Sequence, residues 1–253
     1  MKIYPALTED LTAWALRQPI FFTASAPTHG SHVNVSPKGL SPSHFAVLSP
    51  SLVAYVDRTG SGCETAAHAY ENGRLTIMFT SFGPAPRILR LFCRAEIVEQ
   101  DHPDFSALLA KIGDASGCGR RVYVGARAIV RGHVWRVTTS CGFGVPLIRK
   151  ELLPPGENEL YAFTERPTLE LWASKQVEKA DDAILEYQAA NNAKSLDGLP
   201  GLKSARRDAG EKLLIVKDVE ARVRRLWHER MSVLFGFLLA VLLFTFGKAF
   251  KQV

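Results

Sequence analysis

Short apolar runs separated by turn-forming residues dominate the first two-thirds of the chain. The runs are rich in β-branched and aromatic residues, and glycine, proline, asparagine and aspartate stand between them. This pattern predicts strands over residues 19–24, 32–35, 52–56, 75–79 and 88–98, and one or two more over 122–139. We expect the strand at 32–35 to stop at Pro37 and Gly39. Short strands at regular spacing favour a barrel or sandwich over a doubly wound sheet.

Helical patterns occur twice among the strands and throughout the last third. Ser61 and Glu64 match the S-x-x-E capping box, and Asn72-Gly73 supplies a left-handed stop, so we expect a helix between them. Further helices are expected at 104–112, 168–191 and 208–230. Residues 195–201 are expected to form a loop, because two glycines and a proline there break any helix.

The end of the chain is its most apolar part. Residues 231–246 carry no ionisable side chain and reach about 24 Å as a helix, slightly less than a hydrocarbon core. A buried core helix is the alternative. The run is apolar on all sides and follows a basic segment, which favours a transmembrane tail anchor over 231–249. The positive-inside rule then gives a cytosol-facing domain, on the endoplasmic reticulum or mitochondrial outer membrane in a eukaryote.

Composition is that of a globular protein, with 47% hydrophobic and 22% charged residues. Much of the net charge of +6 falls between residues 203 and 230, which favours a membrane surface over nucleic acid as a partner. Residues 1–10 lack a secretory signal, so reduced thiols are expected. The cysteines form no C-x-x-C pair and predict neither a disulfide framework nor a zinc site; they are Cys63, Cys93, Cys118 and Cys141.

Two polar segments follow predicted strands. In residues 55–65 a strand gives way to a glycine-containing turn and a helix start, where backbone N–H groups and the helix dipole favour a phosphate. The side chains that add charge or hydroxyls are Arg58, Thr59, Ser61 and Thr65. The alternative is an ordinary capped helix whose N-terminus is already occupied by Glu64.

The earlier segment offers Asn34, Ser36 and Lys38, a set that suits a flavin ring edge or a phosphate; a solvated hairpin turn is the alternative. Arg90 lies in an apolar strand and needs a partner, either a ligand or a carboxylate such as Asp57. His29 and His32 stand three apart in a loop-like segment without an obvious third ligand, so no metal site is predicted.

Five blocks taken together resemble the signature blocks of the pyridoxamine 5'-phosphate oxidase-like family. They are residues 32–39, 59–68, 86–91, 139–146 and 195–202, within a resemblance that covers residues 1–205. The resemblance implies an FMN-binding split β-barrel, usually a homodimer with each flavin at the subunit interface. It implies that Asn34, Ser36 and Lys38 face the flavin, and that Thr59, Glu64 and Thr65 lie by the ribityl phosphate.

The chain departs from that family at two places. Cys63 stands where an asparagine is expected, and the C-terminal block that brings arginines and a histidine to the substrate phosphate is absent. An activity on pyridoxamine 5'-phosphate is therefore not expected.

The sequence thus predicts a mainly β split barrel with peripheral helices, a charged helical stalk and an anchor. The expected divisions are a flavin-binding-type domain (1–150), its helical extension (151–205), the stalk (206–230) and the transmembrane helix (231–249). The expected function is an FMN-dependent oxidoreductase of unknown substrate. The alternative is a non-catalytic flavin, deazaflavin or haem binder that serves as a membrane-tethered regulator. The expected cofactor-binding residues are Asn34, Ser36, Lys38, Arg58, Thr59, Ser61, Glu64, Thr65 and Arg90.

Overall fold

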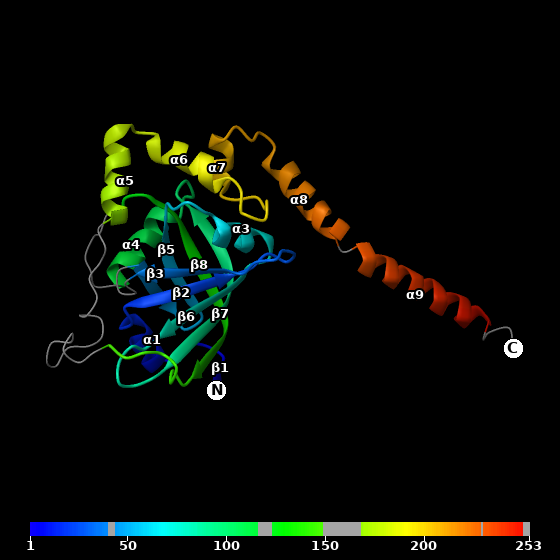
Figure 1. Cartoon of the computed structure of the whole chain (residues 1–253), viewed down its shortest axis with the longest axis horizontal. Coiled ribbons are helices and arrows are strands. Elements are labelled where there is room, and N and C mark those ends of the chain that lie inside the picture. Colours follow the sequence, from blue (N-terminus) through cyan, green and yellow to red (C-terminus); the bar gives the residue numbers. More distant parts are fainter. Residues whose placement is uncertain (40–43, 116–122, 149–167, 229, 250–253) are drawn as a thin grey trace. The chain divides into compact units, whose positions relative to one another are not determined.

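The structure is a computed structural model that describes residues 1–39, 44–115, 123–148, 168–228 and 230–249 (Figure 1). It separates into two compact units, Met1–Glu211 and Lys212–Val253. The first unit is mainly β, with helices around a curled sheet. Its strands are β1 (Lys2–Tyr4), β2 (Ile20–Ser25), β3 (Asn34–Gly39), β4 (Phe45–Ser49), β5 (Leu52–Arg58), β6 (Arg74–Thr80), β7 (Ile88–Glu99) and β8 (Ala126–Ser140).

The described strands form one antiparallel sheet in the order β3-β2-β6-β7-β8-β5-β4, with β1 added beside β8. Phe21 of β2 and Phe45 of β4 come from nearly opposite ends of this order, yet their ring centroids are only 5.3 Å apart. Phe79 of β6 packs against both rings. The sheet therefore curls around a single aromatic core, as the barrel prediction requires.

A second apolar layer covers part of the outer face. Phe105, Leu108 and Ile112 of α4 (Phe105–Ala115) pack on Val56 of β5 and Ile129 of β8. Residues 53–57 of β5 and 127–130 of β8 are thus buried on both faces, which explains the continuous apolar run in β5. The other helices of this unit are α1 (Glu9–Leu16), α3 (Glu64–Glu71), α5 (Thr168–Lys179), α6 (Ala183–Asn192) and α7 (Lys203–Asp208).

The start of α3 corrects the predicted capping box. Cys63, not Ser61, occupies the N-cap position, and its side chain makes no capping hydrogen bond. Glu64 does not reach back to the cap, because its Oε1 accepts a hydrogen bond from the N–H of Leu196, 2.9 Å away. The predicted stop is confirmed, since Gly73 has a φ of 72° directly after the C-cap Asn72.

Other elements differ from the sequence pattern in extent. β3 continues through Pro37 to Gly39, which an edge strand tolerates because its outer N–H groups need no partner. Residues 126–140 form one long strand, and the helical stretch from 168 divides into α5 and α6. Four elements were not predicted: β1, α1, β4 and α7.

The second unit contains α8 (Leu214–His228) and α9 (Arg230–Ala249). Among the residues whose side chains the structure describes, no helix is both long and apolar enough to cross a membrane. The predicted transmembrane anchor is therefore not supported.

Candidate functional site

A row of polar side chains lies on one face of the edge strand β3. Asn34, Ser36 and Lys38 are half-buried, whereas the intervening residues are exposed. The register pairs these three with Ser25, Thr23 and Phe21 of β2, respectively. Because Phe21 belongs to the aromatic core, the row lies on the inner face of the sheet, at its edge.

Hydrogen bonds connect the Asn34 end of this row to Thr65 of α3. The amide of Asn34 donates to the hydroxyls of Ser25 at 3.4 Å and Thr65 at 3.2 Å. Its Oδ1 accepts a 3.5 Å bond from the hydroxyl of Ser36. The structure thus brings Asn34, Ser36 and Thr65 together, although they come from two predicted segments.

At the other end of the row, Lys38 is held by a buried acid. Its Nζ lies 3.4 Å from Oδ1 of Asp57, and Nε of Arg127 donates to Oδ2 of Asp57 at 2.8 Å. Burial by itself disfavours the charged carboxylate, but the charges of Arg127 and Lys38 outweigh it and lower the pKa of Asp57. Asp57 therefore stays ionised and fixes the Lys38 ammonium beside the Tyr55 ring.

The turn after β5 uses its polar groups within the protein. Thr59 is 1% exposed; its hydroxyl donates to the carbonyl of Gly125 at 2.8 Å and accepts from the Gln188 amide at 2.9 Å. Asn192 of α6 donates to the carbonyl of Gly60 at 2.9 Å. Because Gln188 of α6 and the Gly125 carbonyl both bond to the Thr59 hydroxyl, this hydroxyl is not available to a ligand.

Arg58 is also committed to neighbouring protein groups. It donates to the carbonyl of Val124 at 2.9 Å and forms a 3.3 Å ion pair with Glu170. Ser61 lies exposed in the same turn. The phosphate site at residues 58–65 stays a prediction. Of its side chains, the structure commits Thr59, and Arg58 through one of its nitrogens, to protein partners.

Arg90 lies on the opposite face of the sheet from the β3 row. It pairs with Met78, which pairs with Phe22, which in turn pairs with Pro37. Since neighbouring residues of a strand point to opposite faces, Arg90 is separated from Lys38. Arg90 donates to the hydroxyl of Ser140, 3.1 Å away, whereas Asp57 pairs with Lys38 and Arg127.

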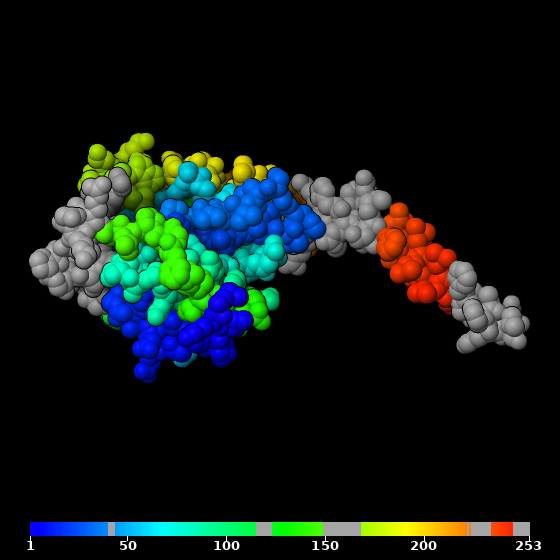
Figure 2. All heavy atoms as spheres, turned by 60° about the horizontal axis from the view of Figure 1, so that its bottom comes forward, coloured from blue at the N-terminus to red at the C-terminus, as the bar shows by residue number. Residues whose placement is uncertain are grey.

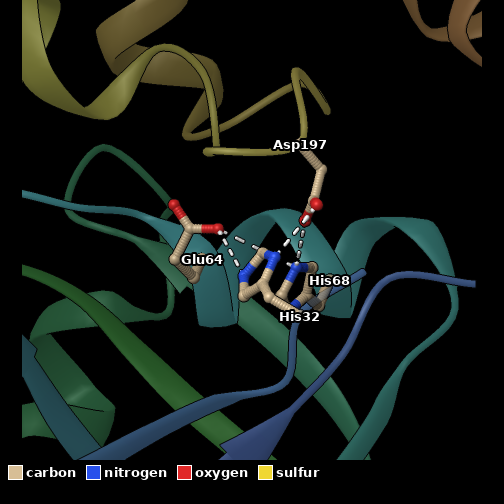
Figure 3. Close-up of side chains that lie close together, drawn as sticks. All are labelled: His32, Glu64, His68 and Asp197. Atoms are coloured by element: carbon tan, nitrogen blue, oxygen red, sulfur yellow. Dashed lines mark hydrogen bonds and ion pairs between the residues drawn. The ribbon is translucent and has the colours of Figure 1, made fainter. Parts of the chain in front are cut away.

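A second polar cluster adjoins Asn34 and was missed by sequence reasoning. It consists of His32, Glu64, His68 and Asp197, whose potential ligand atoms all lie within 4.8 Å of one another (Figure 3). No third ligand beside His29 and His32 was evident in the sequence, and in the structure Asp197 approaches His32 from 165 residues away. The i, i+4 spacing of Glu64 and His68 was the signal available in the sequence.

The described residues fit a flavin only in part. Along β3, the Asn34 amide and the Ser36 hydroxyl already donate to protein groups, whereas the half-buried Lys38 ammonium has further N–H donors for the polar edge of a flavin ring. In the turn at 58–62, Thr59 is committed to Gly125 and Gln188, and Ser61 is exposed.

Fold and site together define a curled antiparallel barrel with a row of polar side chains at its edge. The chain is 50% identical over 208 residues to the pyridoxamine 5'-phosphate oxidase family protein ustO of Aspergillus flavus, which covers 82% of this chain and 80% of that one. This chain therefore belongs to the pyridoxamine 5'-phosphate oxidase family. No family model matches it.

Solved structures give weaker similarities. A putative pyridoxamine 5'-phosphate oxidase from Listeria innocua is 9% identical, with a TM-score of 0.37, over 52% of this chain and 95% of that one. An FMN-binding protein from Syntrophomonas wolfei is 12% identical, with a TM-score of 0.38, over 55% of this chain and 86% of that one. Similarities this weak do not define the cofactor or activity of this chain.

Proposed function

We propose that this chain is an FMN-dependent oxidoreductase that acts on a small substrate. The observation that supports this most is the row of Asn34, Ser36 and Lys38 on the concave edge of a barrel in this family. A bound flavin supplies the redox chemistry, and the protein binds and orients it. The chain's location on the cytosolic side of a membrane stays a prediction.

The residues of the row divide the work of binding. Lys38 presents a positive charge whose position is fixed by the ionised Asp57. Asn34 is oriented by Ser25 and Thr65 and holds the hydroxyl of Ser36 in turn. Since the Thr59 hydroxyl is used within the protein, we propose that a second protomer supplies further phosphate contacts, as in the homodimer that the family resemblance implies.

Flavin binding to the purified full chain tests this function. We expect FMN fluorescence to change saturably during titration, and Lys38→Ala to weaken binding roughly ten- to a hundredfold, because a charge-assisted hydrogen bond contributes about 1.5–3 kcal/mol. Arg127 still pairs with Asp57 in that variant, so its fold should persist, and thermal unfolding checks this.

Lys111→Ala is the matched control, since Lys111 is an exposed lysine on α4. Its affinity for FMN should equal that of the wild type. Failure of wild-type protein to bind FMN at concentrations of tens of micromolar would exclude the proposed cofactor. Equal binding by Lys38→Ala would show that the flavin lies elsewhere.

A non-catalytic ligand binder is the second candidate. It is favoured by the commitment of Thr59, and of one Arg58 nitrogen, to protein partners, which leaves fewer side chains for a flavin phosphate. The absorbance spectrum of the purified chain separates the possibilities, because flavin, haem and empty protein absorb differently.

A further inference from the structure

We propose that His32, Glu64, His68 and Asp197 bind one divalent first-row transition-metal ion, with Zn²⁺ as the representative ion. Three segments supply these residues: the approach to β3, the first turns of α3 and the loop before α7 (Figure 3). The approach to β3 and that loop also lie side by side on the surface in Figure 2. The inference is independent of the proposed flavin.

The distances between the side chains match those between ligands of one ion. Oδ2 of Asp197 lies 3.3 Å from Nε2 of His68. Its Oδ1 lies 3.0 Å from Nδ1 of His32, a contact outside the ligand set, because each residue offers one atom and His32 would bind the ion through Nε2. Oε2 of Glu64 lies 3.6 Å from Nε2 of His32 and 3.9 Å from Nε2 of His68. Metal–ligand bonds of about 2.0–2.2 Å place tetrahedral ligand atoms about 3.3–3.6 Å apart. Only small side-chain rotations are needed.

Two atoms of the cluster lack a hydrogen bond within the described part of the chain. Nε2 of His32 and Oε2 of Glu64 are both buried, and they face each other at 3.6 Å, which is too far for a hydrogen bond. Buried polar atoms of this kind call for an explanation such as an ion. A metal bound to both would satisfy them at once.

The carboxylates are held in place by the backbone around them. Oε1 of Glu64 is fixed by the N–H of Leu196, which leaves Oε2 for the cluster. Gly198, with a φ of 74°, turns the loop directly after Asp197. A Cβ on Gly30 would lie 2.9 Å from Oδ1 of Asp197 and 2.5 Å from a Pro27 carbon, so only glycine leaves space for this carboxylate.

His68 also has the outer support that metal ligands typically have. Its side chain is fully buried, and its Nδ1 lies 3.0 Å from the hydroxyl of Ser25. When Nδ1–H donates to Ser25, the lone pair of Nε2 is directed at the cluster. Asn34 donates to the same Ser25 hydroxyl, which links the cluster to the β3 row.

Donor type and charge indicate the class of ion. Two imidazoles favour zinc and its first-row neighbours over magnesium and calcium, which prefer oxygen ligands alone. Two carboxylates with two neutral imidazoles balance the charge of a dication. His32 is 27% exposed and Glu64 20% exposed, so the ion can enter from solvent.

The test uses the full chain, stripped with a chelator and dialysed. Zn²⁺ is titrated by calorimetry, bound metal is counted by mass spectrometry after gel filtration, and Mg²⁺ serves as the hard-cation control. We expect one Zn²⁺ per chain with a Kd of about 1 μM or tighter, a higher Tm that the chelator reverses, and no comparable effect of Mg²⁺.

Variants locate the ion. Replacement of the fully buried His68 can unfold the chain, so Asp197→Asn and His32→Ala carry the test; each should weaken Zn²⁺ binding at least tenfold. Ser25→Ala should weaken it roughly ten- to a hundredfold while all four ligands remain. His133→Ala is the matched control, because His133 also lies beside a carboxylate, Glu96, but on the exposed face of β8.

Two results would overturn the proposal. One is the absence of stoichiometric Zn²⁺ binding by the wild-type chain. The other is unchanged affinity in Asp197→Asn, which would assign the ion to another part of the molecule and leave the cluster a set of ion pairs.

Discussion

Glu99 at the end of β7 attaches the last helix of the first unit to the sheet. Its side chain accepts hydrogen bonds from the backbone N–H groups of Lys203 and Ser204 at 2.6 and 2.7 Å, and from the Ser204 hydroxyl at 2.5 Å. The Tyr70 hydroxyl is a fourth donor. Burial and the neighbouring Glu99 charge raise the pKa of Tyr70, so this hydroxyl stays protonated and donates.

Replacing Glu99 by glutamine keeps the side-chain volume but replaces one of the two accepting oxygens with an NH₂ group. One amide oxygen can still accept from two of the four donors, but the NH₂ group then faces the other two. Two charge-assisted hydrogen bonds are lost, each worth about 1.5–3 kcal/mol, so the free energy of unfolding should fall by about 3–6 kcal/mol. For a unit of this size, that corresponds to a Tm lower by about 6–24 °C.

Thermal and urea unfolding of the full chain, followed by circular dichroism, measure the effect. Glu96→Gln is the matched control, because Glu96 lies on the same strand but is exposed, with Arg131 and His133 as partners. That change should alter stability by less than about 1 kcal/mol. In limited proteolysis, the protease should cleave the chain near α7 in Glu99→Gln but not in the wild type or in Glu96→Gln. If Glu99→Gln unfolds like Glu96→Gln and resists protease equally, Glu99 does not attach α7.

Two further results are expected. The pKa of Asp57 is lowered in the folded chain, so its contribution to the free energy of unfolding is complete above the unfolded pKa of about 4 and is lost as the pH falls through the lower folded pKa. Asp57→Asn should therefore lose less stability than the wild type over that acidic window. An acid transition like that of the wild type would contradict this. Gly201→Ala should lower the Tm by several degrees, since its Cβ would lie 2.2 Å from the Asn192 carbonyl oxygen and 2.7 Å from the Cys63 sulfur. Gly144→Ala, with open space around its Cβ, is the control; equal Tm values for the two variants would refute the steric argument.

The sequence pattern predicted those elements in which buried residues recur at a regular spacing. The aromatic and β-branched runs became β2, β5, β6 and β7, because every second residue, or every residue, meets the core. It was insufficient for β1, which has three residues and depends on pairing with β8. It also placed the end of β3 too early, since whether Pro37 is tolerated depends on the strand's position in the sheet.

The candidate site was predictable only where its residues are close in sequence. Asn34, Ser36 and Lys38 share a face by simple alternation, which the spacing alone indicates. Asp197 could not be assigned to His32 from sequence, because their proximity depends on how the loop before α7 packs. The partners of Thr59 could likewise not be predicted from the sequence, since Gln188 lies 129 residues further along the chain.

The pairing of β1 with β8 has a consequence for how the barrel forms. Lys2 lies opposite Thr139, so the first strand of the chain cannot be placed until the last strand has left the ribosome. Contacts between such distant residues carry a large loop-closure entropy, and proteins rich in them fold slowly. During synthesis the apolar strands before β8 remain without their central partner, and an unpaired strand edge is prone to aggregation. We therefore expect nascent chains that end before residue 126 to be retained by chaperones, whereas chains that extend past residue 140 can close the sheet.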